Sequence, residues 1–565
     1  MSLTAALTTA TRSLDIFSLG IQVAGHNIAN ASTPGYVREE LTTTTNPPYQ
    51  WGNLVLGTGA TVSSIRQQLD DYLEQRIRTA NTDYAAANQR YDAYLQLQTM
   101  LGELGDQDLS TRLNQFLESI QNVVNQPDDA ALRTQVIQRG GQLATDALQL
   151  HQRIEELRAT SSDNIRSLVE EANTLIRSIA QLNPQIARLE ANGLAPNEAG
   201  SLRIQRLNAL QRLSEIIPLR VQENSSGSVD LFTGSDYLLL GGSYQLLETV
   251  VEPNEAGEAQ LNVQLSRTHS LLGAGGGELG GLIEGRDAVL GGFLNQLDQL
   301  IGSVIFEFNK LHSSGEGLRG YTSVTGAYAV ADTTAALNAA GLEFMPGHGS
   351  FLLKVRNQST GAIEVSNLAI DLDGIGADTS LEDLRAALDA IDRVTAEITA
   401  DGRLKLTADG GYELRFGNDT SGVLAALGIN TFFTGTNSGN IAVNPLLRQD
   451  QRYLATGRGG GPADNANAIA LAAFLDNPVA ALGGLSLEDF HTALIGSVAQ
   501  SAAAEEALTS GFERFRDALN TQREQRSGVS LDEEAVRIMQ LQRNYQAAAR
   551  IVATIDELLN TLLNV

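Results

Sequence analysis

Apolar residues recur in alternating steps of four and three at both ends of the chain. In this heptad pattern two positions in seven form a narrow apolar stripe, which is typical of a helix that packs along another helix. The N-terminal stripe consists of Leu3, Leu7, Ala10, Leu14, Phe17, Ile21, Ala24 and Ile28. The C-terminal stripe consists of Ile538, Leu541, Tyr545, Ala548, Val552, Ile555, Leu559 and Leu562. We predict that the two helices pair as a coiled coil. The alternative is that each docks on its nearest domain.

The middle of the chain changes its period several times. Helical spacing between residues 65 and 213 predicts long amphipathic helices, broken near 104–106, 125–127 and 192–196. Alternation with a period of two then predicts short strands near 219–265. Helical spacing returns at 279–311 and again near 466–515.

These patterns predict a mainly α multidomain protein with β insertions, nested so that its two ends belong together. Residues 1–60 and 521–565 would form a terminal coiled-coil domain with an extended arm. Residues 61–315 and 449–520 would form a long-helix domain with the small β subregion. Residues 316–448 would form a β-rich outer insert with one capped helix at 380–391. The length of 565 residues supports several domains, because one hydrophobic core rarely exceeds about 300 residues.

Composition narrows the class of protein. The net charge is -27 and no basic patch is segregated, so we expect no nucleic-acid partner. No apolar run approaches the roughly 18 to 20 residues needed to span a bilayer, so we expect no membrane partner. The first 25 residues lack the basic and apolar regions of a Sec signal peptide. If the chain is exported, it must use a pathway other than Sec.

Candidate chemistry is sparse. Cysteine is absent, which removes thiolate metal sites and thiol nucleophiles. The six histidines are too far apart for a helical metal pair, and residues 371–378 resemble an incomplete calcium loop that is better explained as a turn. The glycines at 275–280 and 457–461 lack the context of a nucleotide site. We therefore predict no metal, no cofactor and no catalytic residues, although a Ser-His-Asp arrangement can be recognised only from coordinates.

The segment after the first stripe is more specific. It reads His26-Asn27-Ile28-Ala29-Asn30-Ala31-Ser32-Thr33-Pro34-Gly35-Tyr36. Helix-ending residues precede a Pro-Gly turn, and Tyr36 to Thr44 form an extended, β-branched run. The string Asn-Ile-Ala-Asn-x-x-Thr-Pro-Gly-Tyr resembles the signature shared by flagellar rod, hook and hook-associated proteins. A capped Ser-Leu-Asp-Glu-Glu start at 530–534 is similar to the C-terminal end of the same families.

The long helices of the middle are similar to those of the hook-associated proteins, whereas rod proteins are far shorter and hook protein is mostly β in its middle. This resemblance implies a structural axial component at the junction between hook and filament. Hook protein remains an alternative, as does a secreted adhesin whose insert at 316–448 carries the activity. The expected assembly interface is made by the large residues of the two stripes, and the expected signature turn by Asn27, Asn30, Thr33, Pro34, Gly35 and Tyr36.

The resemblance also implies where the protein works and with what. We expect an extracellular flagellar protein exported through the flagellar type III apparatus. The implied partners are other copies of the chain in a ring, hook protein, a second junction protein, the filament cap during assembly, and a cytosolic export chaperone at the C-terminal region.

Overall fold

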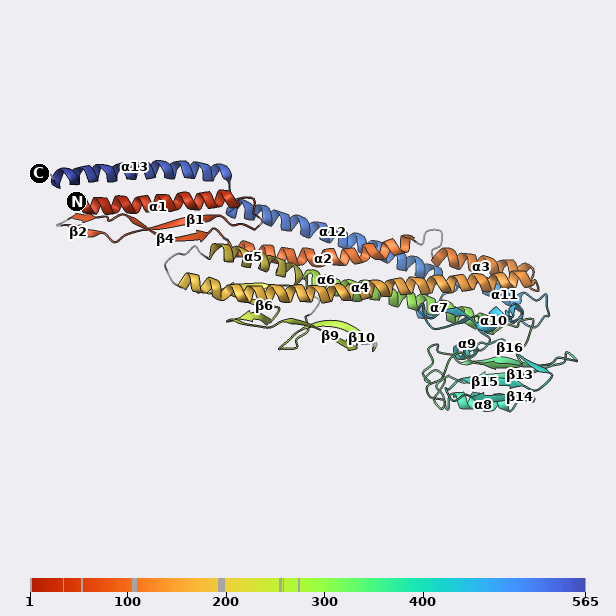
Figure 1. Ribbon diagram of the computed structural model, residues 1–565. Coiled ribbons are helices and arrows are strands. Elements are labelled where there is room, and N and C mark those ends of the chain that lie inside the picture. Colours follow the sequence, from red (N-terminus) through yellow and green to blue (C-terminus); the bar gives the residue numbers. More distant parts are fainter. Residues whose placement is uncertain are drawn as a thin grey trace. The chain divides into compact units, whose positions relative to one another are not determined.

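The computed structural model describes residues 3–33, 35–51, 54–103, 109–191, 199–253, 257, 259–272 and 275–563. Figure 1 shows its helices and strands, coloured along the sequence. Contacts between residues group the chain into two units. Unit 1 contains residues 1–93, 160–286 and 503–565, and unit 2 contains residues 94–159 and 287–502. The contacts therefore give two units instead of three, and the three-domain division stays a prediction.

Helices dominate the chain, as the sequence predicted. The longer ones are α1 (Leu3–Asn30), α2 (Asp71–Glu103), α3 (Leu109–Asn125), α4 (Ala130–Ala191), α5 (Gly200–Ile216), α7 (Gly292–Ser313), α12 (Leu487–Ser527) and α13 (Leu531–Leu563). The shorter ones are α6 (Gly277–Glu284), α8 (Leu381–Asp389), α9 (Val423–Leu427), α10 (Pro445–Gln449) and α11 (Ala466–Ala472). A π-helical turn, Gly285–Gly291, joins α6 to α7.

The strands form small antiparallel sheets. In unit 1 they are β1 (Glu39–Thr45), β2 (Tyr49–Trp51), β3 (Leu54–Leu56), β4 (Ala60–Gln67), β5 (Arg220–Glu223), β6 (Val229–Thr233), β7 (Asp236–Leu240), β8 (Ser243–Tyr244), β9 (Leu247–Pro253) and β10 (Ala259–Leu265). In unit 2 they are β11 (Ser323–Thr325), β12 (Gly349–Asn357), β13 (Ile363–Ile370), β14 (Val394–Ile398), β15 (Leu404–Ala408), β16 (Tyr412–Gly417), β17 (Phe433–Thr434) and β18 (Ala442–Val443).

Unit 1 has its core where the C-terminal half of α4 and α5 cover the strands β6 to β10. Ile176, Leu213, Leu231 and Val263 belong to one apolar cluster and are almost fully buried. Asn173 joins helix to sheet, because its side chain both donates to the Leu247 carbonyl and accepts from the Leu247 amide. A polar group at this depth is tolerated because its hydrogen bonds are made.

Unit 2 is centred on aromatic side chains. Phe116, Phe308, Phe432 and Phe433 lie within 5.1–5.7 Å of one another between ring centroids, apart from the closer Phe432–Phe433 pair at 4.7 Å. Gly140 permits this packing, since a Cβ atom there would meet the Phe432 ring at 2.6 Å. Neighbouring phenylalanines in such edge and tilted contacts add to the stabilisation given by buried area alone.

A buried histidine adjoins these rings. His312 contacts the Asn430 carbonyl through Nδ1 at 2.8 Å, and its Nε2 accepts from the Ala455 amide. Burial lowers its pKa to about 4, so the ring is neutral at pH 7 and both of its nitrogens are used. His312 is therefore a structural residue.

Two three-stranded sheets, β13-β12-β16 and β11-β15-β14, make up most of the predicted insert. Its capped helix is confirmed: α8 begins after Ser380, which forms a reciprocal capping box with Asp383. The helical stretch expected at 466–515 is interrupted, because α11 ends at Ala472 and Gly483 adopts a left-handed conformation before α12 begins. The helix expected from residue 65 begins only at Asp71, because Ile65 lies in β4. The breaks expected at 104–106 and 192–196 lie outside the described residues.

The segment Gly277–Ser313 is long and apolar enough to cross a membrane by length and composition, contrary to the expectation from unbroken apolar runs. Most of its most apolar window is buried inside the protein, as in the core helix of a soluble fold. Phe308 and Ile305 on this segment are fully buried.

Candidate assembly interface

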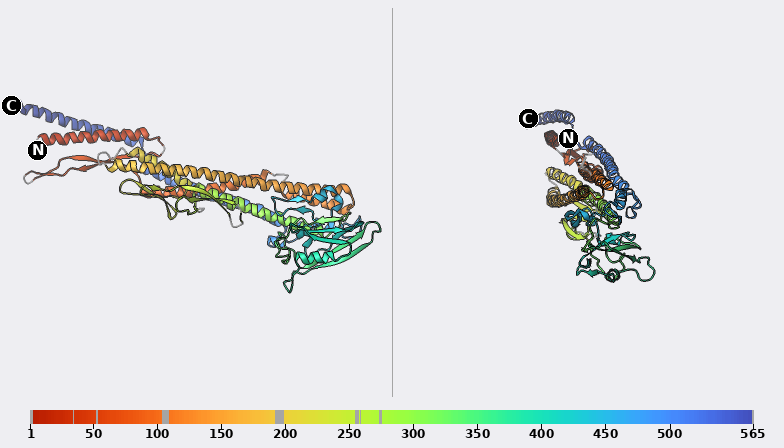
Figure 2. Two further views of the ribbon diagram at one scale, coloured as in Figure 1. Left: turned by 60° about the horizontal axis from the view of Figure 1, so that its bottom comes forward. Right: turned by 90° about the vertical axis from the view of Figure 1, so that its right-hand side faces the viewer.

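The two chain ends lie side by side within unit 1. Helices α1 and α13 contact each other along their lengths, and both views show them adjacent (Figures 1 and 2). On α13 the inward face is the predicted stripe: Ala548 and Ile555 are buried, and Ile538, Leu541, Val552 and Leu559 are half-buried. Tyr545, at the same face, is 41% exposed. The side chain of Leu562 lies outside the described residues.

Helix α1 is covered on a wider face than its stripe. Besides α13 it contacts β1 and β4, which form a long antiparallel hairpin. Its fully buried residues are Ala10, Gly20, Val23, Ala24 and Asn27, and only two of them belong to the predicted stripe. The large residues of that stripe, Leu3, Leu7, Leu14, Phe17, Ile21 and Ile28, are half-buried. The heptad rule missed Gly20, where a Cβ atom would meet the Leu541 side chain at 3.0 Å.

Charged residues also join the two ends of the chain. Arg38 donates to the carboxylate of Glu534 at 2.7 Å and pairs with Glu533 at 3.2 Å. The Arg38 amide donates to the carbonyl of Ser527, at the end of α12. Because the Glu534 side chain is fully buried, this ion pair escapes the screening that weakens surface pairs. The sequence alone could hardly predict this ion pair, because Arg38 and the two glutamates are nearly 500 residues apart.

The signature turn is built around Asn27. This fully buried side chain donates through Nδ2 to the Glu39 carbonyl at 2.9 Å, and its Oδ1 accepts from the Glu39 amide at 3.0 Å. The same oxygen accepts from the Tyr36 hydroxyl at 2.8 Å. Burial and the nearby carboxylate of Glu39 raise the pKa of Tyr36 above its usual value, so the phenol keeps the proton that it donates. One asparagine thus holds the start of β1 against α1.

The other signature residues shape the chain reversal. Asn30 donates to the His26 carbonyl, and Thr33 lies within 3.5 Å of Asn30. Gly35 has a φ of +74°, a conformation that favours glycine, and a Cβ atom there would overlap Asn208. Pro34 lies outside the described residues. The extended arm expected after Tyr36 is present as β1, paired with β4 in the hairpin.

Replacing Asn27 by Leu should release β1 from α1. The change leaves the Glu39 amide and carbonyl and the Tyr36 hydroxyl without their buried partner, and each unmet group costs about 1 to 3 kcal/mol. Hydrogen exchange of the segment 36–45 in the full chain should accelerate markedly. The matched control is Asn30→Ala, which removes an exposed bond and should leave this exchange unchanged. Unaltered exchange in Asn27→Leu would contradict the assignment.

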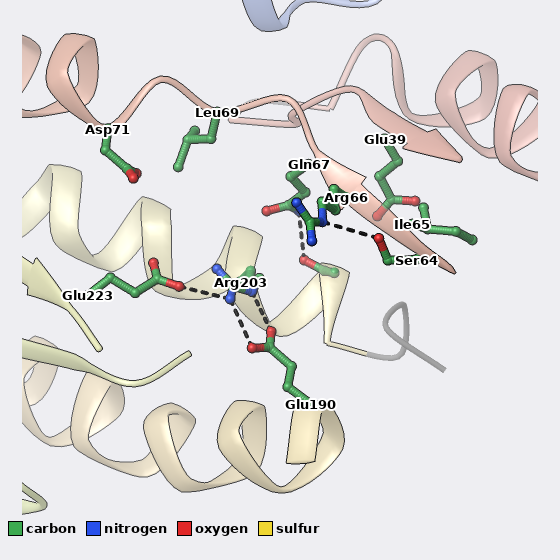
Figure 3. Close-up of a pocket in the computed structure, with 11 residues that line it drawn as sticks. Glu39, Ser64, Ile65, Arg66, Gln67, Leu69, Asp71, Glu190, Arg203 and Glu223 are labelled. Atoms are coloured by element: carbon green, nitrogen blue, oxygen red, sulfur yellow. Dashed lines mark hydrogen bonds and ion pairs between the residues drawn. The ribbon is translucent and has the colours of Figure 1, made fainter. Parts of the chain in front are cut away.

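A cavity of about 580 Å³ lies beneath the end of β4, between this strand and the helices α4 and α5 (Figure 3). Its lining includes Arg203, which pairs with Glu190 at 2.6 Å and with Glu223 at 2.8 Å. Despite burial, these two carboxylates raise the pKa of Arg203. The charge of Arg203 is therefore already neutralised by two acidic side chains of the same unit.

One serine, histidine and aspartate do meet in unit 2. The Ser438 hydroxyl donates to Asp298, and His151 Nδ1 lies 2.8 Å from the same hydroxyl and 3.5 Å from Asp298. A catalytic relay uses the two different ring nitrogens for the serine and the acid. Here one nitrogen faces both, and Ser438 is fully buried. This arrangement fastens a loop to two helices and does not present a nucleophile.

Comparison with known proteins agrees with the geometry of the ends. Residues 94–326 match the family model "Flagellar hook-associated protein FlgK helical domain", and residues 521–565 match "Flagellar basal body rod FlgEFG protein C-terminal". The chain is 24% identical to flagellar hook-associated protein 1 of Bacillus subtilis, across 99% of this chain and 97% of the relative. It is also 24% identical to hook-associated protein 1 of Escherichia coli, across 98% of both chains.

The chain is similar to flagellar hook-associated protein 1 along almost its whole length. The sequence resemblance to hook-associated proteins is thereby confirmed. The fold is similar to the solved hook junction protein FlgK of Burkholderia pseudomallei, with a TM-score of 0.51 and 16% identity over 81% of this chain and 100% of that one. The predicted fold class, mainly α with a β-containing insert, is also confirmed.

Proposed function

We propose that this protein is a structural axial component of the bacterial flagellum that forms the junction between hook and filament by polymerising. The observation that carries this proposal is the pairing of α1 with α13 beside the signature turn, in a chain that aligns almost end to end with hook-associated proteins 1. The function follows from contact between surfaces, and no catalytic step is part of it.

The terminal helices form the assembly interface. The large residues of the α1 stripe pack against the C-terminal stripe as a coiled coil. They are half-buried, so the exposed part of each side chain remains accessible to neighbouring copies; they are Leu3, Leu7, Leu14, Phe17, Ile21 and Ile28. The outer face of α13 supports this role, since Val536, Ile551 and Leu558 are 48–53% exposed. Apolar side chains on a face away from the pair are favourable where a further subunit covers them.

The partners follow from the position of the junction. Copies of the chain associate in a ring, which contacts hook protein on one side and the second junction protein on the other. The filament cap retains subunits during assembly, and a cytosolic chaperone binds the C-terminal region before export. The protein acts outside the cell after export through the flagellar type III apparatus.

Deleting the gene tests this function. Cells without the protein should carry hooks that lack filaments and should not swim, and expression of the intact chain should restore both filaments and swimming. Electron microscopy of isolated flagella gives the result directly. Filaments that persist on the hooks of the deletion strain would overturn the proposal.

A further inference from the structure

A histidine and two aspartates converge at one end of the β12–β13 pair, in unit 2. Gly349 of β12 pairs with Ile370 of β13 at the end of the ladder, so His348 and Asp371 are the next cross-strand neighbours. Leu372 is buried, and Asp371 and Asp373 flank it. Since side chains alternate along an extended segment, burying Leu372 places both carboxylates on the side that His348 faces.

The distances suit a shared ion. His348 Nδ1 lies 3.2 Å from Asp371 Oδ1, and the ligand atoms of all three residues lie within 4.8 Å of one another. Ligand atoms bound to one cation at about 2.0 to 2.2 Å are separated by roughly 3 Å. The first pair therefore already has the spacing of two ligands of one metal. Asp373 is the third ligand within reach, and its Oδ1 also accepts from the Ile375 amide at 2.8 Å.

One oxygen of this cluster is unsatisfied in a way that points to a cation. Asp371 Oδ1 is inaccessible to solvent and has no hydrogen-bond donor among the described residues. It faces His348 Nδ1, which itself accepts a long bond of 3.3 Å from the Leu372 amide. Two acceptor atoms thus face each other at close range. A positive ion between them would satisfy both, and it could enter from solvent, because the Asp371 side chain as a whole is 48% exposed.

We propose that His348, Asp371 and Asp373 bind a divalent first-row transition metal ion, with Zn²⁺ as the representative ion. One imidazole and two carboxylates form a ligand set that suits such ions, whereas calcium prefers oxygen ligands alone. The sequence analysis predicted no metal here, because the spacing of residues along the chain indicated only an incomplete calcium loop at 371–378. The third ligand comes from the neighbouring strand, where spacing along the sequence cannot show it.

Binding of Zn²⁺ would tie the loop after β13 to the start of β12 and so stabilise the insert. This inference is independent of the junction role, because all three residues belong to unit 2, whereas α1 and α13 belong to unit 1. The full chain suits the measurement, since it contains no cysteine that could compete for the ion.

Calorimetric titration of the chelator-treated full chain with Zn²⁺ tests the proposal. We expect one saturable site that His348→Ala and Asp373→Asn each weaken at least about tenfold, since even outer-sphere changes at metal sites cost 10- to 100-fold. We also expect Zn²⁺ to raise the melting temperature of the native chain but not that of His348→Ala.

A second histidine provides the matched control. His269 Nδ1 lies 3.5 Å from Glu248 and is 66% exposed, comparable to His348 at 58%. His269→Ala should leave the affinity for Zn²⁺ unchanged, and Ca²⁺ should bind the native chain more weakly than Zn²⁺. The proposal is overturned if Zn²⁺ does not bind, if His348→Ala binds it like the native chain, or if both histidine variants lose the same affinity.

Discussion

Replacing Ile555 by Asp should separate the two terminal helices and abolish filament attachment. Ile555 is 6% exposed, on the face of α13 that meets α1. None of the residues in the two stripes is cationic, and burying an unpaired charge costs several kcal/mol. Two helices that pack through a narrow apolar stripe are held together by only a small free energy. The cost of burying the charge exceeds it, so the helices should separate. The large half-buried Phe17 on α1 should be similarly intolerant of Asp.

Another isoleucine on the same helix is the control. Ile551 lies one turn earlier and is 53% exposed, so Ile551→Asp adds the same charge without burying it in the pair. In the soluble chain, hydrogen exchange of α1 and α13 should become fast in Ile555→Asp and stay slow in Ile551→Asp. Cells that carry Ile555→Asp should have bare hooks. Slow exchange together with normal filaments in Ile555→Asp would refute the paired interface.

Replacing Arg133 by Met should produce the largest loss of stability in unit 2. The Arg133 side chain is fully buried and donates to the carbonyls of Pro127 and Leu454 and to the Thr456 hydroxyl. Burial lowers its pKa to about 10, so it remains charged at pH 7 and its donors are strong. Its guanidinium joins the α3–α4 connection to the segment after α10, more than 300 residues away.

Methionine fills much of the same volume but satisfies none of these acceptors. With buried acceptors left unpaired at about 1 to 3 kcal/mol each, we expect a loss of about 3 to 5 kcal/mol, or roughly 10 °C in melting temperature for a unit of this size. Differential scanning calorimetry of the full chain measures this shift. Arg139→Met is the control, because Arg139, also on α4, bonds within the described part of the chain only to the side chains of Gln115 and Gln142. If the melting temperature fell equally in the two variants, the hydrogen bonds of Arg133 would not be the cause, and this prediction would be wrong.

The sequence predicted the elements at the chain ends well because their determinants are local. A helix boundary depends on residues within a few positions, so the start of α13 could be read from Ser530, just as the start of α8 in the insert could be read from Ser380. The stripe of α13 was equally readable, since a helix that packs on one partner buries one stripe. The stripe of α1 was predicted less completely, because the hairpin of β1 and β4 covers a second face that heptad spacing does not reveal.

The sequence by itself thus determined the helical character of the ends, the apolar face of α13, the signature turn and the family resemblance, all from short-range patterns of side-chain volume and polarity. Only the tertiary structure decided which distant residues meet: Arg38 with Glu534, His348 with Asp371, and Ser438 with His151 and Asp298. Such meetings depend on strand register and on how separate segments pack, since a contact across tens or hundreds of residues leaves no periodic trace along the chain.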